Sequence, residues 1–357
     1  MADAWVFYDN GSDVSMIRKD YEISSLGDDE LLLKPIYGSM EGNIVHAFNK
    51  FPEDVFSLRG EKEIVMGNAG VMLVSETGRN ISDLQKGDLC IYFCNGEPDR
   101  YGYPKKITGY DKKSSMGVMA KTIRLNRNEV IKIPKNSSIS LPQWAIFSLK
   151  FITAWSNWKL AYNAYHIQLP EVSDEEISVW GWGGGVSYAE IRLAQLMGCR
   201  AGLITSKQSI TELCTKHGID VLDRKIRNNS LKKFRKAFFD KAGSEGASIF
   251  VDNIGAETYQ DTIRFLSREG VIATNGWKDG AVYPVIRSSE CINRHIHVHT
   301  HYASMPEGIE AVEFALNHDW IPQYTGRIYD FDSLPELMED YRCGRLENYF
   351  TVFQINN

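Results

Sequence analysis

The chain has 357 residues, of which 43% are hydrophobic and 24% are charged, and its formal net charge is −6. This length predicts two domains, and the composition is that of a globular protein with a sizeable core. The negative net charge provides no field that attracts nucleic acid or an anionic membrane, and the chain lacks the run of about 18 apolar residues that a membrane span needs.

Six cysteines are scattered along the chain, a usage that fits a reducing cytoplasm better than a disulfide framework. Cys90 and Cys94 are the only close pair, and no second pair lies nearby as a structural zinc site requires. The first residues, MADAWVFYDNGSD, lack the basic and apolar regions of a signal peptide. We therefore expect a cytoplasmic protein without a structural zinc.

The first 140 residues are predicted to be rich in β-strands, because short apolar runs alternate there with turn-forming Gly, Asn and Asp. The expected strands are 5–8, 31–33, 71–74, 89–93 and 130–133. Residues 141–165 change in character and predict a long, largely buried helix. The last 40 residues return to strand-like runs, notably 349–355.

Strands and helices alternate from residue 177 to about 318, which predicts an α/β domain with a doubly wound parallel sheet. The carboxyl ends of the strands in such a sheet meet at one edge, where nucleotides bind. The expected strands are 177–181, 201–205, 219–222, 247–252, 270–275 and 295–300. The expected helices are 186–197, 208–217, 230–242, 257–267 and 306–317.

The most informative stretch is the glycine-rich turn after the first of these strands, which holds Gly181, Gly183, Gly184 and Gly185 and leads into a helix near Val186. The amino end of a helix offers N–H groups and a positive dipole end to a phosphate, and glycines let the backbone approach it. The strict third glycine position holds Val186, and the looser spacing ends at Ser187. A tight turn without a ligand is the alternative interpretation.

Five segments together resemble the medium-chain dehydrogenase/reductase superfamily, in particular its zinc-independent quinone and enoyl reductase branch. They are 67–70 (GNAG), 151–155 (FITAW), 181–195, 251–255 (VDNIG) and 344–345 (GR). The resemblance implies a GroES-like β-rich catalytic domain of residues 1–140 and 319–357. It also implies an inserted Rossmann dinucleotide-binding domain of residues 141–318.

The resemblance also identifies the positions at which zinc-dependent relatives hold their catalytic metal. Met40, Asn68 and Leu149 occupy them here, and none is a good zinc ligand, since zinc prefers thiolate, imidazole or carboxylate. We therefore expect no metal site. Related reductases often carry a tyrosine where this chain has Phe51, whose ring cannot donate a proton. The proton donor is left open.

The resemblance implies a nicotinamide dinucleotide as the cofactor. NAD sites usually have an acid about 20 residues past the glycines, to bind the ribose hydroxyls. The second strand here is instead followed by Ser206 and Lys207, and Arg224 follows the third, so we expect NADPH. In the alternative interpretation Lys207 only begins a solvated helix, and the basic run from Arg224 to Lys241 is better explained as a solvated face.

The remaining site residues are inferred by resemblance. Thr153, Asn253, Asn275 and Gly276 are expected near the nicotinamide side of the cofactor, although each asparagine could also be an ordinary turn residue. Candidates for stabilising negative charge on the substrate are Asn43, Asn68 and Tyr37, ahead of Glu41 and His46.

Four of the eight histidines fall at His295, His297, His299 and His301, where an extended strand places them on one face. Metal binding, pH sensing, and packing or pairing of an edge strand with a second subunit are the alternatives. We expect a homodimer formed through this last Rossmann strand.

These observations predict a zinc-independent, NADPH-dependent oxidoreductase. It would transfer hydride to an electron-poor C=C, first an α,β-unsaturated carbonyl, or to a C=O of a small organic substrate. Two alternatives are open. One is a specialised-metabolite dehydrogenase or reductase that uses the same cofactor at another carbon centre. The other is a cofactor-binding protein without turnover.

Overall fold

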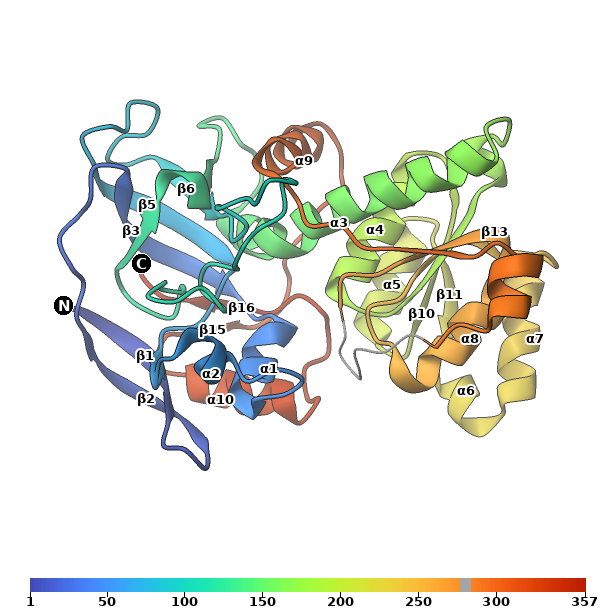
Figure 1. The fold of residues 1–357 in the computed structure, drawn as a ribbon, viewed down its shortest axis with the longest axis horizontal. Helices are drawn as coiled ribbons and strands as arrows, with labels where there is room; N and C mark the ends of the chain where they lie inside the picture. The colour runs from blue at the N-terminus through green and yellow to red at the C-terminus, as the bar shows by residue number, and fades with distance from the viewer. Residues whose placement is uncertain (277–283) are drawn as a thin grey trace. The chain divides into compact units, whose positions relative to one another are not determined.

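The computed structural model describes residues 1–276 and 284–357, which form two compact units (Figure 1). Unit 1 comprises Met1–Ile152, Ala303–Leu346 and Phe350–Asn357, and unit 2 comprises Thr153–Tyr302 and Glu347–Tyr349. The start of helix α3 (Leu141–Gln168) and all of helix α9 (Met305–Asn317) therefore belong to unit 1, whereas the sequence boundaries at 140 and 318 assigned them to the Rossmann domain. Within the described ranges, no helix combines the length and apolar character needed to cross a membrane.

Unit 1 is built on β-sheets, as expected from its short apolar runs. A seven-stranded sheet has the order β15-β16-β3-β5-β6-β8, with β7 also paired to β3, and a three-stranded sheet has the order β2-β1-β4. The strand β16 from the end of the chain pairs antiparallel with β3 near its start. The strands are β1 (Ala2–Asp9), β2 (Val14–Tyr21), β3 (Glu30–Ser39), β4 (Glu63–Ile64), β5 (Gly70–Thr77), β6 (Leu89–Tyr92), β7 (Ile123–Asn126), β8 (Val130–Lys132), β15 (Ile328–Tyr329) and β16 (Val352–Gln354).

The sheets of unit 1 enclose an apolar core that includes Val6, Leu33, Met72 and Phe353, all fully buried. Burial follows the alternation of the strands, as seen in β1, because successive side chains point to opposite faces. The other helices of unit 1 are α1 (Gly42–Asn49), α2 (Val55–Arg59) and α10 (Leu334–Arg342).

Unit 2 contains a six-stranded sheet of order β11-β10-β9-β12-β13-β14, in which every pairing is parallel. This is the strand order of a Rossmann fold. The strands are β9 (Ser178–Trp182), β10 (Arg200–Thr205), β11 (Asp220–Asp223), β12 (Ala247–Val251), β13 (Leu266–Ala273) and β14 (His297–His299). The helices after α3 are α4 (Gly185–Leu196), α5 (Gln208–Lys216), α6 (Lys225–Asn229), α7 (Leu231–Ala242) and α8 (Tyr259–Phe265). The predicted doubly wound α/β architecture is confirmed.

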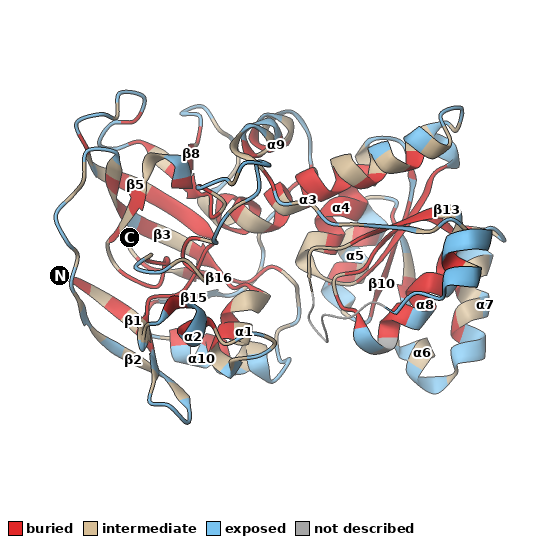
Figure 2. Cartoon of the chain, viewed as in Figure 1, coloured by how far each residue is buried: buried red, intermediate tan, exposed pale blue. Residues whose placement is uncertain are grey.

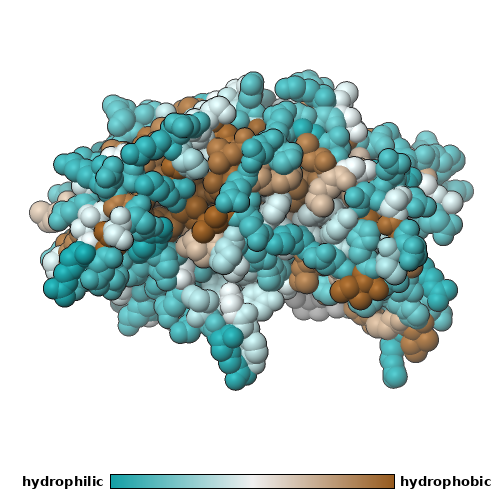
Figure 3. All heavy atoms as spheres, turned by 90° about the horizontal axis from the view of Figure 1, so that it is seen from above, coloured by the Kyte–Doolittle hydropathy of each residue, from teal (hydrophilic) through white to brown (hydrophobic). Residues whose placement is uncertain are grey.

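The central strands of unit 2 are buried on both faces, which Figure 2 shows as continuous red. Such strands have apolar runs rather than alternation, because helices cover both sides of a parallel sheet. An aromatic cluster packs on one face, where the rings of Phe238 and Phe265 stack with centroids 3.8 Å apart. The face of the molecule seen in Figure 3 is mostly hydrophilic, with hydrophobic side chains gathered in a few patches.

The last strand of the sheet is shorter than expected. Only His297 and His299 lie in β14, with rings stacked at a centroid distance of 6.0 Å. His295 has a left-handed backbone (φ 52°), and its ring contacts Glu269 at 2.9 Å. The prediction that four histidines share one strand face is therefore wrong, because the extended backbone that would align them covers only three residues.

Candidate functional site

The glycine turn joins β9 to α4, as predicted. Gly184 is the N-cap of α4, and no side chain caps this helix. The residues from Gly183 to Val186 are partly exposed, whereas the strand before them and Ser187 after them are buried. Since the first N–H groups of a helix have no partner within it, this end offers donors and a positive dipole end to a ligand.

The glycines of this turn have different roles. A Cβ on Gly181 would lie 3.0 Å from Val251 of β12, and a Cβ on Gly183 would lie 2.1 Å from the hydroxyl of Tyr349. A Cβ on Gly184 would meet only Ser187 Oγ, at 3.6 Å. Gly181 and Gly183 thus permit close packing of the protein, and Gly184 leaves room for another molecule to approach the backbone.

Two basic residues lie at the same edge of the sheet as the turn. Ser206 and Lys207 directly follow β10, and Arg224 directly follows β11, the neighbouring strand. The Lys207 backbone N–H donates to Thr205 Oγ1 (3.2 Å), and the Arg224 N–H donates to the Thr205 carbonyl (3.1 Å). The Arg224 guanidinium also lies 5.8 Å from the ring centroid of Trp182. Thr205 therefore anchors both basic residues.

Tyr349 joins this cluster from the far end of the chain, and the sequence analysis did not include it. Its hydroxyl lies 2.8 Å from Thr205 Oγ1, and the Lys207 Nζ lies 5.6 Å from its ring centroid. Burial raises the pKa of Tyr349, so its hydroxyl is protonated at neutral pH. In the sequence, only the position of Tyr349 shortly after the Gly344-Arg345 pair distinguishes it, and this position does not predict its contact with Thr205 or Lys207.

The asparagines after β12 and β13 lie together on the other side of β9. Asn253 Oδ1 accepts from the Asn275 backbone N–H (2.7 Å), and Asn253 Nδ2 donates to Ser187 Oγ (3.3 Å). Asn275 Nδ2 donates to the His301 carbonyl (2.6 Å), and Asn275 Oδ1 is buried without a hydrogen-bond partner in the described ranges. A Cβ on Gly276 would lie 2.9 Å from the Asn253 carbonyl oxygen. This cluster presents one unused acceptor.

These features of unit 2 fit a dinucleotide. The open helix end suits a pyrophosphate, the two basic residues suit a further phosphate, and an unpartnered carboxamide oxygen suits an N–H donor. Thr153, in contrast, lies on α3, where its carbonyl accepts from Ser156 (3.1 Å), and no described hydrogen bond joins it to the turn.

In unit 1 the three segments that the resemblance associates with a metal converge. The Ser39 N–H donates to the Ala69 carbonyl (3.1 Å), and the Gly70 N–H donates to Ser148 Oγ (2.8 Å). Met40, Asn68 and Leu149 therefore lie on interlocked segments, and Met40 and Asn68 are 2% exposed. The described residues contain no group of three or more His, Cys, Asp or Glu side chains arranged to hold a metal ion.

A buried ion pair between Lys150 and Glu41 occupies this region. Lys150 is 4% exposed and Glu41 is 5% exposed, and their charged groups are in contact. Lys150 Nζ also donates to Ser39 Oγ (2.8 Å) and to the Met40 carbonyl (3.3 Å). Buried ammonium groups need such compensation, which here joins α3 to the end of β3. From the sequence, Glu41 was only a secondary candidate, and no local pattern pointed to Lys150.

The predicted catalytic residues of unit 1 differ in their surroundings. Asn43, at the start of α1, and Asn68 each have a buried side-chain oxygen without a partner among the described residues. Tyr37 is half-buried within β3, and Phe51 is 60% exposed. Burial raises the pKa of the nearby Cys94 thiol to about 12, so this thiol is neutral. Each of the two asparagines thus has an unused hydrogen-bond acceptor, whereas the Asn68 side chain already bonds to the Cys94 thiol.

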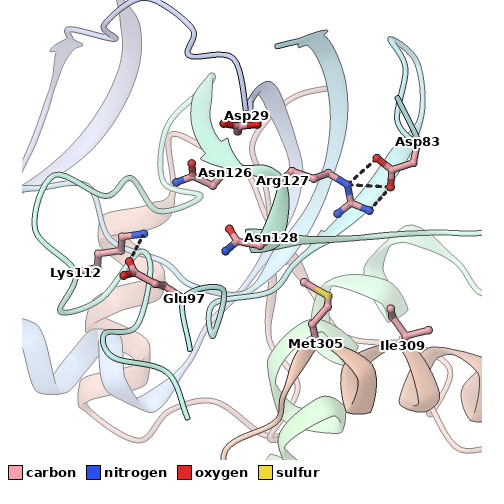
Figure 4. A pocket seen from close by; sticks show the side chains of 9 residues that line it. All are labelled: Asp29, Asp83, Glu97, Lys112, Asn126, Arg127, Asn128, Met305 and Ile309. Atoms are coloured by element: carbon pink, nitrogen blue, oxygen red, sulfur yellow. Dashed lines mark hydrogen bonds and ion pairs between the residues drawn. The ribbon is translucent and has the colours of Figure 1, made fainter. Parts of the chain in front are cut away.

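A surface hollow of about 640 Å³ lies elsewhere in unit 1 (Figure 4). Its cations are already paired, Arg127 with Asp83 and Lys112 with Glu129. None of the predicted site residues lines it, so it does not contribute to the candidate site. Its lining comprises Asp29, Asp83, Glu97, Lys112, Asn126, Arg127, Asn128, Met305 and Ile309.

No protein-family model matches the sequence. The structure is similar to a crotonyl-CoA carboxylase/reductase, AntE, solved in complex with NADP (TM-score 0.80, 17% identity, covering 99% of this chain and 94% of that one). It is also similar to the alcohol dehydrogenase of the archaeon Aeropyrum pernix (TM-score 0.80, 19% identity, covering 99% of this chain and 100% of that one). A third similar structure is CAD from Helicobacter pylori, complexed with NADP(H) (TM-score 0.75, 14% identity, covering 99% of this chain and 97% of that one).

At these identities the likeness establishes the fold. The chain has the fold of the medium-chain dehydrogenases/reductases, with a β-rich unit and a Rossmann unit, as the sequence motifs indicated.

Proposed function

We propose that this chain is an NADPH-dependent oxidoreductase of the medium-chain dehydrogenase/reductase superfamily. The observation that carries the proposal is the open glycine turn at Gly184, with Lys207 and Arg224 following the two adjacent strands. The similar structures named for NADP complexes support the same cofactor. When bound, NADPH supplies a hydride.

The residues of unit 2 would bind the phosphates of this cofactor. The N–H groups at the start of α4, in Gly184, Gly185 and Val186, would bind the pyrophosphate, and Lys207, Arg224 and Ser206 would bind the 2′-phosphate. The end of β10 carries Thr205 and Ser206 instead of the acid that NAD sites usually have there, and Asp223 at the end of β11 accepts from the Lys225 backbone N–H (2.8 Å).

The nicotinamide side would be formed by Asn253, Asn275 and Gly276, with Thr153 contributing from α3. The unpartnered Asn275 Oδ1 can accept a hydrogen bond from a carboxamide. A Cβ at Gly276 would crowd Asn253, which supports a role for this glycine in keeping the cluster compact.

We propose that catalysis does not use zinc. Met40, Asn68 and Leu149 stand at the positions of metal ligands, and none of them offers the thiolate, imidazole or carboxylate that zinc prefers. Asn43 and Asn68, followed by Tyr37, would stabilise negative charge on the substrate by donating hydrogen bonds from the Nδ2 amide groups of the asparagines and from the tyrosine hydroxyl. Phe51 can donate no proton, so water or another residue completes the proton transfer.

The proposed substrate is a small organic molecule with an electron-poor C=C, first an α,β-unsaturated carbonyl, or a C=O. The Lys150 charge is neutralised by Glu41, so this region contributes no uncompensated cation and favours an uncharged acceptor. The reductases and dehydrogenases among the similar structures support this class.

The test is NADPH consumption with a panel of enones, aldehydes and ketones. We expect saturable oxidation with at least one class. Asn43→Ala and Asn68→Ala should each lower kcat/KM on the order of 100-fold, as loss of an oxyanion donor does. Asn80→Ala is the matched control, because Asn80 is exposed in the same unit and bonds to Asp29. Tight NADPH binding with no turnover across the panel would instead indicate a cofactor-binding protein.

We also propose a cytoplasmic homodimer formed through β14. All six cysteines are without disulfides, and β14 is the edge of its sheet, with Val298 41% exposed. Val298→Lys should convert the dimer to a monomer in light scattering, whereas Ile167→Lys, at an exposed apolar position on α3, should not. A monomeric wild-type protein would contradict the proposal.

A further inference from the structure

Tyr349 lies on the glycine turn, although more than 160 residues of chain separate the two. A Cβ on Gly183 would lie 2.1 Å from the Tyr349 hydroxyl and 2.9 Å from its Cζ atom. Only glycine at residue 183 leaves room for the Tyr349 ring at this position. The segment Glu347–Tyr349 is held in unit 2 by a second bond, from Ser209 Oγ to the Glu347 carbonyl (2.8 Å).

The contacts of Tyr349 lead to the two basic residues. Its hydroxyl shares a hydrogen bond with Thr205 Oγ1 (2.8 Å), and this same oxygen accepts from the Lys207 backbone N–H (3.2 Å). The Thr205 carbonyl accepts from the Arg224 N–H (3.1 Å). Thr205 is 1% exposed, so water does not compete for these hydrogen bonds.

The ring of Tyr349 acts on the Lys207 side chain directly. The Lys207 Nζ lies 5.6 Å from the ring centroid, within the range at which an aromatic face attracts an ammonium. A flexible lysine side chain has many rotamers in solution and loses this freedom when it binds a phosphate. A contact that already orders the side chain in the unliganded protein therefore reduces the entropy lost on binding.

We propose that Tyr349 is a positioning residue for cofactor selection. Its ring holds the Lys207 ammonium, and its hydroxyl holds Thr205, so that the cationic edge is ordered for the 2′-phosphate that distinguishes NADPH from NADH. The inference rests on the proposed function and extends it. It assigns part of the phosphate selectivity to the last segment of the chain, outside the strand–turn–helix unit.

The test is the dissociation constant of NADPH and of NADH, measured by calorimetry for Tyr349→Leu and Tyr349→Phe. Tyr349→Leu removes both contacts, and we expect it to weaken NADPH binding by about tenfold with little change for NADH. Tyr349→Phe keeps the ring and should recover most of the loss. Tyr162→Phe is the control, because its hydroxyl bonds to Asp174 in the same unit, away from the turn.

Lys207→Gln, made alone and together with Tyr349→Leu, tests whether Tyr349 acts through Lys207. We expect Tyr349→Leu to have almost no further effect on NADPH once Lys207 is replaced. Melting temperatures verify that each variant is folded. If a folded Tyr349→Leu variant weakens NADPH and NADH equally, or neither, the inference is wrong and the proposed function stands. If the wild-type protein binds neither nucleotide, both are wrong.

Discussion

Glu190 places a carboxyl group in the interior of unit 2, on helix α4. It is fully buried, its Oε1 accepts from Asn157 Nδ2 (2.8 Å), and its Oε2 has no hydrogen-bond partner among the described residues. Burial raises the pKa of Glu190 well above its usual range, because an ionised carboxylate would lose its hydration. The folded protein therefore retains this proton at pH values where the unfolded chain has released it.

Glu190→Gln should stabilise the protein at neutral pH. With the folded-state pKa raised, the stability that the protonated carboxyl provides is complete below the unfolded pKa of about 4.3 and is lost as the pH rises towards the folded value. A glutamine does not titrate, so we expect a gain on the order of 1–3 kcal/mol at pH 8 and much less at pH 5. Urea unfolding at both pH values measures it. An equal difference in unfolding free energy between Glu190→Gln and the wild-type protein at both pH values would contradict the explanation.

The effects of replacing Lys150 and Glu41 on the unfolding free energy should depend on each other. Lys150→Met leaves the Glu41 carboxylate buried without its cation, which should cost about 3–5 kcal/mol of unfolding free energy. The double variant Lys150→Met with Glu41→Gln should recover most of that loss, because neither charge is then buried. Urea unfolding of the two single variants and the double variant gives the coupling energy. Additive effects would show that the ion pair has no role in stability.

The sequence indicated the candidate residues that directly follow a strand, and it gave no signal for those that depend on distant contacts. Ser206, Lys207 and Arg224 could be identified because each follows a recognisable apolar run. Tyr349 and Lys150 could not, since their partners lie 144 and 111 residues away along the chain, and no local pattern encodes such pairing.

Among the elements, the glycine turn contains two glycines that are needed for packing and one, Gly184, that we propose is needed for phosphate binding. Gly184 has an extended backbone (φ 179°) that any residue can adopt, and the space above it is open. Gly184→Ala should therefore change the unfolding free energy by less than about 0.5 kcal/mol. Its methyl group would keep a phosphate from the helix end, so we expect NADPH binding to weaken by about tenfold or more.

Gly183→Ala is the matched comparison for this prediction. Its Cβ would overlap the Tyr349 hydroxyl, so it should lower the melting temperature as well as NADPH affinity. Calorimetry and thermal unfolding of the two variants separate the effects. Unchanged NADPH affinity in a stable Gly184→Ala protein would show that no phosphate binds there.

Elements with a strong pattern were predicted well, and weakly patterned ones were not. The buried strands of unit 2 are continuous apolar runs, which mark them clearly. β2 was missed because half of its sequence, VSMIRKDY, is polar without a regular alternation, and none of its residues is fully buried. β14 was overestimated because alternating histidines resemble a strand, whereas the left-handed backbone of His295 is a tertiary feature.

At the scale of the whole molecule, alternating strands and helices were sufficient to predict the fold class, because they leave few alternatives to a parallel sheet. The grouping of α9 with unit 1 was not foreseeable, since a helix that follows the last parallel strand looks like its continuation. Function is less tightly linked to fold, so the proposed function is argued from a few side chains at one sheet edge.

NADPH is proposed to bind to unit 2 at the start of α4. Isothermal titration calorimetry of the purified full chain with NADPH and NADH tests it most directly. We expect saturable one-site heat for NADPH, binding at least about tenfold weaker for NADH, and a melting temperature that rises with NADPH. Absence of heat with both nucleotides and an unchanged melting temperature would contradict the account.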